Sequence, residues 1–178
     1  MSLLSTIRNY LFDYLRYRFK SARIAVALQA TNRSRVPLGT IGVRDGAEPV
    51  EFIKDMPAYD ADDMLRYWQV TQRGNLILKN NSSNTAYNIR LVNAEAIFDK
   101  IDRLEKLASL APNTSISIPI EFVQSLVAVT GQEADALPLI PAEKQNIYLL
   151  IQYENESGKK MTTKFSVSFG DPVNEYTW

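Results

Sequence analysis

The chain has 178 residues, no Cys and no His, and 20 basic residues against 20 acidic ones. Without Cys it cannot form disulfides or thiolate metal sites. Without His it cannot build a Ser-His-Asp triad or an imidazole-bound zinc or iron site. A chain of this length forms one domain, or one domain with an appendage, and it can bury enough surface to fold without a metal or a disulfide.

The charges are unevenly distributed although they cancel over the whole chain. Residues 1–44 carry eight basic side chains and one acidic side chain, so the remaining residues carry an acidic excess. Such asymmetry is typical of a basic segment that meets an anionic surface or folds onto an acidic body.

Residues 3–22 are predicted to form an amphipathic α-helix. Ser2 or Ser5 can cap it, and no Gly or Pro interrupts it. Its apolar residues follow the i, i+3, i+4 spacing of a single stripe, which comprises Leu3, Ile7, Leu11, Tyr14, Leu15, Phe19 and Ala22. The basic residues Arg8, Arg16, Arg18 and Lys20 interleave with it. We therefore expect an appendage, residues 1–22, and a β-sandwich body, residues 23–178.

The first part of the body is predicted to contain short elements. Residues 24–28 favour a strand, a polar turn follows at 32–37, and the Pro and Gly residues of 36–56 favour short strands broken by turns. Residues 60–68 are predicted to form a short helix, with Asp60 as its N-cap.

The middle of the body is predicted to alternate between strands and turns. Residues 76–78 favour a compact strand, the Asn- and Ser-rich residues 80–84 a turn, and residues 86–92 a strand. One face of that last strand would carry Tyr87, Ile89 and Leu91. Apolar residues with helical spacing in a charged stretch favour one or two helical turns at 99–108.

The C-terminal half shows the clearest strand patterns. Residues 114–122 alternate, with Ile116, Ile118, Ile120 and Phe122 predicted inward, and Pro119 on the other face suggests an edge position. A long excursion follows at 124–145. Residues 147–153 and 160–169 then form two strand-like runs around a polar loop that contains Gly158, which predicts an antiparallel hairpin.

This succession predicts a mainly β fold. Four stretches, Leu-Ile-Leu-Lys-Asn (76–80), Thr-Ala-Tyr-Asn-Ile (85–89), Leu-Ala-Pro-Asn-Thr-Ser (110–115) and Tyr-Glu-Asn-Glu-Ser-Gly (153–158), give an order of strands and turns that resembles bacterial immunoglobulin-like adhesion or accessory modules. The resemblance covers about residues 74–169. It implies an antiparallel immunoglobulin-like β-sandwich, here with an N-terminal amphipathic α-helix, and a binding or scaffold module rather than an enzyme.

The predicted helix is the main candidate for a functional site. Its apolar stripe and basic rim can dock on a protein partner or on a second copy in a homo-oligomer, or simply pack on the chain's own body. An anionic membrane surface is an alternative partner, because aromatic and basic residues interleave as in interfacial helices. Nucleic acid is disfavoured by the acidic body. The candidate residues are Leu3, Ile7, Arg8, Leu11, Tyr14, Leu15, Arg16, Arg18, Phe19 and Lys20.

Other functional patterns are weaker. Asp60, Asp62 and Asp63 lack the Gly and the spacing of a calcium loop, so no metal and no cofactor is expected. A hydrolase that acts through carboxylates alone would require two acids facing each other at roughly 5–10 Å. No apolar run is long enough to cross a membrane and the N-terminus does not resemble a secretory signal, so a cytoplasmic location, peripheral to the membrane if the helix binds lipid, is expected.

Overall fold

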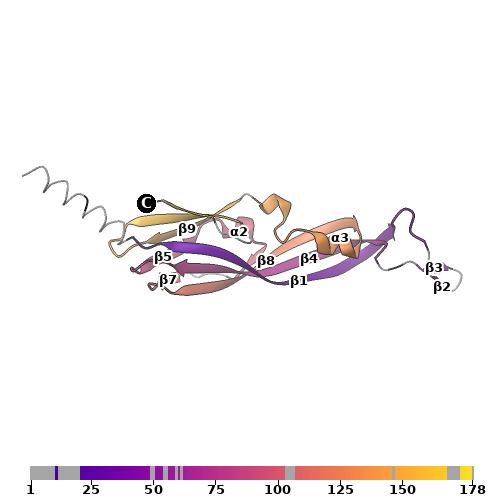
Figure 1. Ribbon diagram of the computed structural model, residues 1–178, viewed down its shortest axis with the longest axis horizontal. Helices are drawn as coiled ribbons and strands as arrows, with labels where there is room; N and C mark the ends of the chain where they lie inside the picture. Colours follow the sequence, from indigo (N-terminus) through magenta and orange to yellow (C-terminus); the bar gives the residue numbers. More distant parts are fainter. Residues whose placement is uncertain are drawn as a thin grey trace, which may run out of the picture.

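The computed structural model describes residues 11, 21–48, 51–53, 56–58, 60, 62–102, 107–145, 147–167 and 173–177. These residues form a mainly β structure with two antiparallel sheets (Figure 1). The predicted mainly β, antiparallel class is therefore confirmed. The predicted N-terminal helix lies outside the described residues, apart from Leu11 and the last two positions of its range, Ser21 and Ala22.

The first sheet has the strand order β1-β4-β8-β6 and the second has the order β11-β10-β9-β5-β7. Their bounds are β1 (Ile24–Val43), β4 (Met64–Asn80), β8 (Ser115–Val129) and β6 (Lys100–Ile101) in the first, and β11 (Asn174–Thr177), β10 (Lys160–Ser166), β9 (Tyr148–Glu154), β5 (Ala86–Leu91) and β7 (Leu107–Leu110) in the second. The strands β2 (Glu51–Ile53) and β3 (Met56–Ala58) pair with each other in a small antiparallel ribbon. Short helices are α2 (Ala94–Ile97), α3 (Gly131–Ala136) and the 3-10 turn η1 (Ala142–Lys144).

One apolar core lies between the two sheets. It takes Leu76 and Ile118 from the first sheet and Ile151 and Phe165 from the second, all nearly or fully buried. Burying each such side chain stabilises the fold by about 1.5–3 kcal/mol, which is why alternating apolar residues fix the register of these strands. The predicted inward faces of 114–122 and of the described part of 160–169 are confirmed.

The predicted hairpin is β9 and β10. Residues of the two strands pair from Glu154 with Lys160 onward, and the connecting loop turns at Gly158, whose φ of 76° suits a residue without a side chain. The Asn155 side-chain oxygen accepts hydrogen bonds from the backbone N–H groups of Ser157 and Lys159, which closes the loop.

The predicted turn at 32–37 and the short strands after it are wrong for residues up to 43, because β1 runs without interruption through them. β1 lies at the edge of its sheet, where a strand tolerates Pro37. Its register breaks at three places, between residues 30 and 32, 37 and 39, and 40 and 42. The Pro and Gly signals therefore mark bulges in an edge strand rather than turns.

The predicted helix at 60–68 is also wrong. Asp60 does accept a hydrogen bond, from the backbone N–H of Asp62, but the bond closes a turn, and β4 begins at Met64. Pairing of β4 with β1 on one side and β8 on the other outweighs the local helical signal, because a central strand satisfies its backbone groups on both edges.

Three further predictions fail in detail. Tyr87 is exposed rather than inward, because Asn88 has a φ of 52° and the register of β5 breaks there, which leaves Ala86 and Ile89 as the buried residues. The described part of 99–108 forms β6 and β7, not helical turns. The predicted excursion at 124–145 begins inside β8, which continues to Val129.

The three long strands extend well beyond the core between the sheets. We call this extension the arm, formed by residues 31–43 of β1, 64–73 of β4 and 123–129 of β8. Figure 1 shows an elongated molecule in which the arm lies at the opposite end from the C-terminal strand, with α3 on one face and with β2 and β3 beyond it. A second, smaller apolar cluster of Trp68, Val70 and Ala134 belongs to the arm.

Candidate interaction surface

Of the ten candidate residues predicted on the N-terminal segment, the structure describes only Leu11, which is helical and 56% exposed. The other nine, Leu3, Ile7, Arg8, Tyr14, Leu15, Arg16, Arg18, Phe19 and Lys20, lie outside the described residues. The predicted site therefore stays a prediction. The body begins at Ser21 and Ala22, which are already buried. A truncation that removes the N-terminal segment should therefore end at residue 20.

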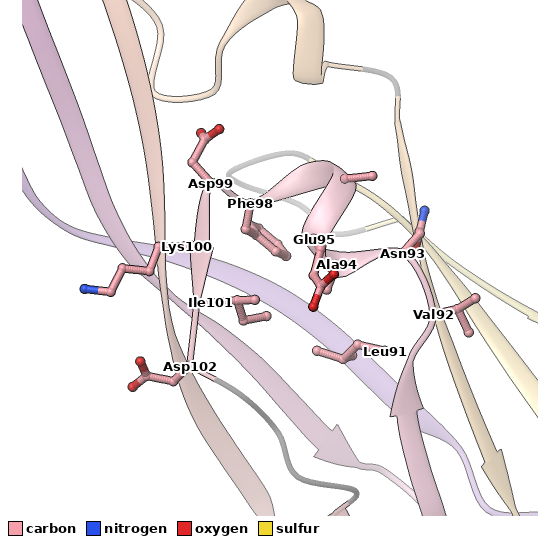
Figure 2. A pocket seen from close by; sticks show the side chains of 11 residues that line it. Leu91, Val92, Asn93, Ala94, Glu95, Phe98, Asp99, Lys100, Ile101 and Asp102 are labelled. Atoms are coloured by element: carbon pink, nitrogen blue, oxygen red, sulfur yellow. The ribbon is translucent and has the colours of Figure 1, made fainter.

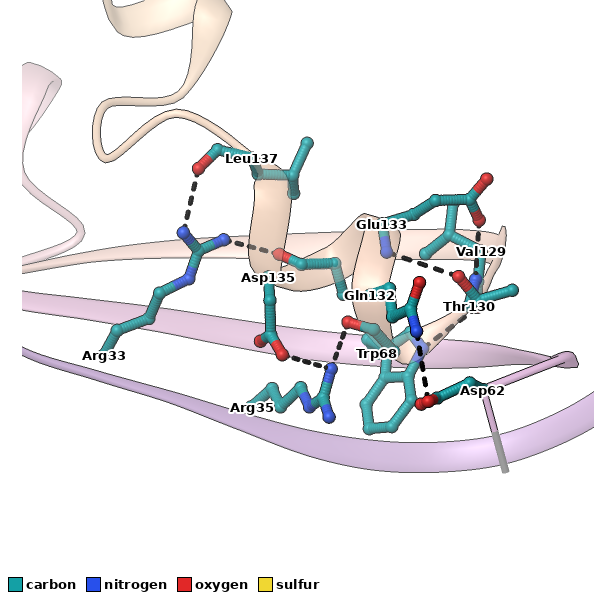
Figure 3. A network of polar contacts seen from close by, with 12 residues as sticks. Arg33, Arg35, Asp62, Trp68, Val129, Thr130, Gln132, Glu133, Asp135 and Leu137 are labelled. Carbon is teal, nitrogen blue, oxygen red and sulfur yellow. Dashed lines mark hydrogen bonds and ion pairs between the residues drawn. The ribbon is translucent and has the colours of Figure 1, made fainter. Parts of the chain in front are cut away.

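The arm has one covered face, and α3 covers it around Trp68 (Figure 3). Trp68 is 6% exposed and packs with Val70 and Ala134, and its indole N–H donates to the Val129 carbonyl at 3.0 Å. Burying this ring and satisfying its single donor accounts for the placement of α3. Trp68 therefore belongs to a small core of the arm.

Two arginines of β1 fasten α3 to this face. Arg33 donates to the carbonyls of Leu137 at 2.8 Å and Ala134 at 2.5 Å, groups that the helix leaves without intrahelical partners. Arg35 donates to the Gly131 carbonyl and pairs with Asp135 at 2.7 Å. Its guanidinium also lies 4.9 Å from the centre of the Trp68 ring, a cation–π distance.

The start of α3 is fixed by a capping box. The Thr130 hydroxyl accepts from the Glu133 backbone N–H at 3.3 Å, and the Glu133 carboxylate accepts from the Thr130 backbone N–H at 2.8 Å. The hydrogen bond from that N–H, helped by Arg44, lowers the pKa of the Glu133 carboxyl below its usual range. Arg44 and Glu133 form an ion pair. This face is thus closed by its own side chains.

The end of the arm also carries exposed apolar residues, and three of them lie at bulges. In β1 the breaks in register leave Leu38 and Ile41 without a paired residue in β4. In β8 Val127 falls between the residues paired with Arg66 and Trp68, next to a residue with φ of 58°. Leu38, Ile41 and Val127 are 61%, 44% and 61% exposed. Bulges re-aim side chains, and these three bulges each leave an apolar side chain in solvent.

Two further apolar residues lie close to these. Val36 and Tyr67 are 52% and 43% exposed. Val36 pairs with Gln69, two residues from Tyr67, so strand alternation puts both side chains on the face turned away from Trp68. We call the five exposed residues the apolar tip, and they are Val36, Leu38, Ile41, Tyr67 and Val127.

Acidic residues adjoin the apolar tip. The described residues 35–48, 60, 62–69 and 123–136 contain seven acids, Asp45, Glu48, Asp60, Asp62, Asp63, Glu133 and Asp135, against three arginines. Two of these arginines pair with Glu133 and Asp135 of α3. The acidic excess therefore comes from the loops that follow β1 and precede β4, beside the end of the arm.

A separate hollow of about 1130 Å³ lies between the end of β5 and β6 (Figure 2). Leu91, Phe98 and Ile101 point toward its middle, whereas Lys100 and Asp102 point away. Asp99 is used structurally, because it accepts from the Val123 backbone N–H at 2.8 Å and pairs with Lys144 at 3.3 Å. The carboxylates labelled in this view do not converge on one point.

The described part of the chain contains no cluster of three or more acidic, His or Cys side chains able to hold a metal ion. Within the same residues, no helix has the length and apolar character needed to span a bilayer. Comparison of the chain with protein-family models, with curated proteins and with solved structures gives no match in any of the three.

Sequence reasoning missed the apolar tip. Pro37, Gly39 and Gly42 interrupt the strand pattern, so Leu38 and Ile41 were assigned to turn-rich sequence rather than to a strand. The available signal was the pairing of large apolar residues with bulge-forming neighbours in a stretch that otherwise has strand composition.

Proposed function

We propose that this chain is a non-enzymatic protein-interaction or scaffold module. In this proposal an immunoglobulin-like β-sandwich body carries an N-terminal amphipathic helix, which docks on a partner or mediates self-association. The observation that carries the proposal is the apolar tip, where five of the exposed large apolar side chains of the described residues gather at one end of the arm. Exposed apolar patches of this kind mark interaction surfaces.

The immunoglobulin-like character is supported by two antiparallel sheets that share one core. The hairpin β9–β10 contributes an inner face of Met161, Thr163 and Phe165, as expected for a strand of a sandwich. The N-terminal segment is supported by its sequence pattern and by the exposure of Leu11.

Binding would be driven by burial of the apolar stripe and would be oriented by the basic residues around it. Each fully buried Leu or Ile side chain contributes about 1.5–3 kcal/mol, whereas exposed charge pairs contribute about 0–1 kcal/mol each. The apolar stripe should therefore set the affinity, and Arg16 and Arg18 should set the choice of partner and the salt dependence.

The full chain with Leu11→Asp and Leu15→Asp tests the proposal, because the pair adds two charges to the predicted stripe. Ser5→Asp with Asn9→Asp is the matched control, since it adds the same charge on the opposite side of the predicted helix. The parent chain and the control should retain the same partners, or the same self-association, and the stripe variant should lose them. Identical behaviour of all three proteins would remove the N-terminal segment as the recognition element.

The same three proteins separate a protein partner from a membrane partner. Flotation with vesicles that contain anionic lipid at low salt should leave all three unbound if the partner is a protein. Binding of the parent and control, and its loss in the stripe variant, would replace the protein partner with a lipid surface.

A further inference from the structure

We propose that the apolar tip and the acidic loops beside it receive the N-terminal segment, residues 3–20, of a second copy of this chain. The inference rests on the proposed function, in which that segment is the recognition element. It adds the receiving surface and the identity of the partner. The two complementary surfaces would lie on opposite ends of the same molecule.

The receiving surface results from a repeated structural feature. Three separate bulges, two in β1 and one in β8, each leave an apolar side chain exposed at the same end of the arm. Bulges in an edge strand usually protect the edge from aggregation, and they do so without any need for Leu, Ile or Val at the extra position. The face of the same strands that carries Trp68 is closed by α3 together with Arg33 and Arg35 of β1.

Charge selects the occupant. Residues 1–20 carry four basic side chains and one acidic side chain. The described end of the arm carries seven acidic side chains against three arginines; two of the arginines pair with Glu133 and Asp135, so five acids and one arginine remain outside these pairs. An apolar stripe with a basic rim therefore meets an apolar patch with an acidic rim, and opposite potentials also speed and orient the encounter.

Geometry favours a second copy over the same chain. β1 starts near the C-terminal strand and ends at the arm, with β2 and β3 beyond (Figure 1). Val36 lies along β1 about 40 Å from Ile24, at roughly 3.3 Å per residue. A helix of the length of the N-terminal segment spans only about 30 Å. The segment as a helix thus falls short of its own tip.

The resulting contact is heterologous, because the end of one copy binds the beginning of another. Such contacts do not close on two copies unless the geometry brings the remaining ends together, so they continue into rings or filaments. The assembly is expected to grow with protein concentration and to dissociate with salt.

Sedimentation velocity on full-length chains tests the receiving surface. Leu38→Ser with Val127→Ser is the acceptor variant, and Val92→Ser with Val173→Ser is its matched control, because both pairs remove exposed apolar side chains. The acceptor variant should weaken self-association about tenfold or more, while the control should not. A parent chain that stays monomeric at its highest concentration, or an acceptor variant that associates as the parent does, would overturn the proposal.

Mixing complementary variants gives the sharper result. The stripe variant, Leu11→Asp with Leu15→Asp, retains the tip, and the acceptor variant retains the N-terminal segment. Each should be monomeric alone, and together they should form a one-to-one dimer. If the stripe variant dissociates but the mixture stays monomeric, the tip is not the receiving surface and the proposed function still stands. If the stripe variant associates as the parent does, both proposals fail.

Reversing the charges on both surfaces gives a test that still decides if the apolar substitutions impair folding. Arg16→Glu with Arg18→Glu, and Asp45→Lys with Glu48→Lys, should each weaken association, and chains carrying both pairs should recover it. Failure of the combined variant to recover would contradict the role of the acidic loops.

Discussion

At the scale of single residues, Asn80 holds together the loops at one end of the body. It is fully buried. Its amide nitrogen donates to the carbonyls of Asn84 at 2.7 Å and Leu110 at 2.9 Å, and its side-chain oxygen accepts from the backbone N–H and the hydroxyl of Ser82. The residue thus serves two loops that connect different sheets, and its conformation depends on a neutral amide.

Asn80→Asp should lower the free energy of unfolding by about 3 kcal/mol or more, because a carboxylate cannot donate to the two buried carbonyls. Asn81→Asp adds the same charge at an exposed neighbouring position and is the control. Urea unfolding of both variants measures the difference. Equal losses would mean that added charge, not the lost amide donor, destabilises the loops.

Tyr153 makes stability depend on pH at the alkaline end. Its hydroxyl lies 3.4 Å from the Thr163 hydroxyl, and burial raises the pKa of Tyr153 above its ordinary value. The neutral phenol is favoured in the folded state, so this contribution is complete below pH ~10, the unfolded pKa. It is lost as the pH rises from there through the folded-state pKa.

Tyr153→Phe should therefore flatten the decline of unfolding free energy above pH ~10, although it costs about 1 kcal/mol at neutral pH through the lost hydrogen bonds. The exposed Tyr87→Phe is the control. Denaturant unfolding over a series of pH values gives both slopes. A slope unchanged by Tyr153→Phe would assign the alkaline loss of stability to other groups.

At the scale of elements, α3 is a short helix that is stabilised by its capping box and by two arginines of β1. Six residues cannot form a stable helix alone. Thr130→Ala should cost about 1 kcal/mol, while Thr130→Ser should keep the cap. Fluorescence of Trp68 in a Trp178→Phe background reports the uncovering of the arm in denaturant. Equal midpoints for the Ala and Ser variants would show that the capping box does not hold α3.

The elements that could be predicted from the sequence are those whose side chains alternate against the core. Ile116, Ile118 and Ile120 of β8 and the inner residues of β10 are examples, because burial enforces a period of two. The prediction of turns around Pro37 and of a helix after Asp60 failed for a common reason. Local Pro, Gly and capping signals report local conformation, whereas strand pairing with distant residues decided both segments.

At the scale of the whole molecule, the sequence predicted two antiparallel layers but not the arm. The arm forms because three paired strands extend beyond the core, and no local pattern in the sequence gives the relative lengths of paired strands. The covered face of the arm could not be predicted from the sequence either. Arg33 and Arg35 make the contacts with α3, whereas arginines in a strand ordinarily indicate a face exposed to solvent. The apolar tip became visible only when register placed Leu38, Ile41 and Val127 at one end.

Energy transfer between labelled copies tests the head-to-tail contact most directly. The chain has no Cys, so one introduced Cys gives a unique labelling position. One population carries a donor dye at Ser5→Cys and another an acceptor dye at Ala136→Cys, an exposed residue at the end of α3. We predict transfer in the mixture that falls with rising salt and is lost with Leu38→Ser and Val127→Ser. Transfer between two Ser5-labelled populations, with none between Ser5 and Ala136, would contradict it.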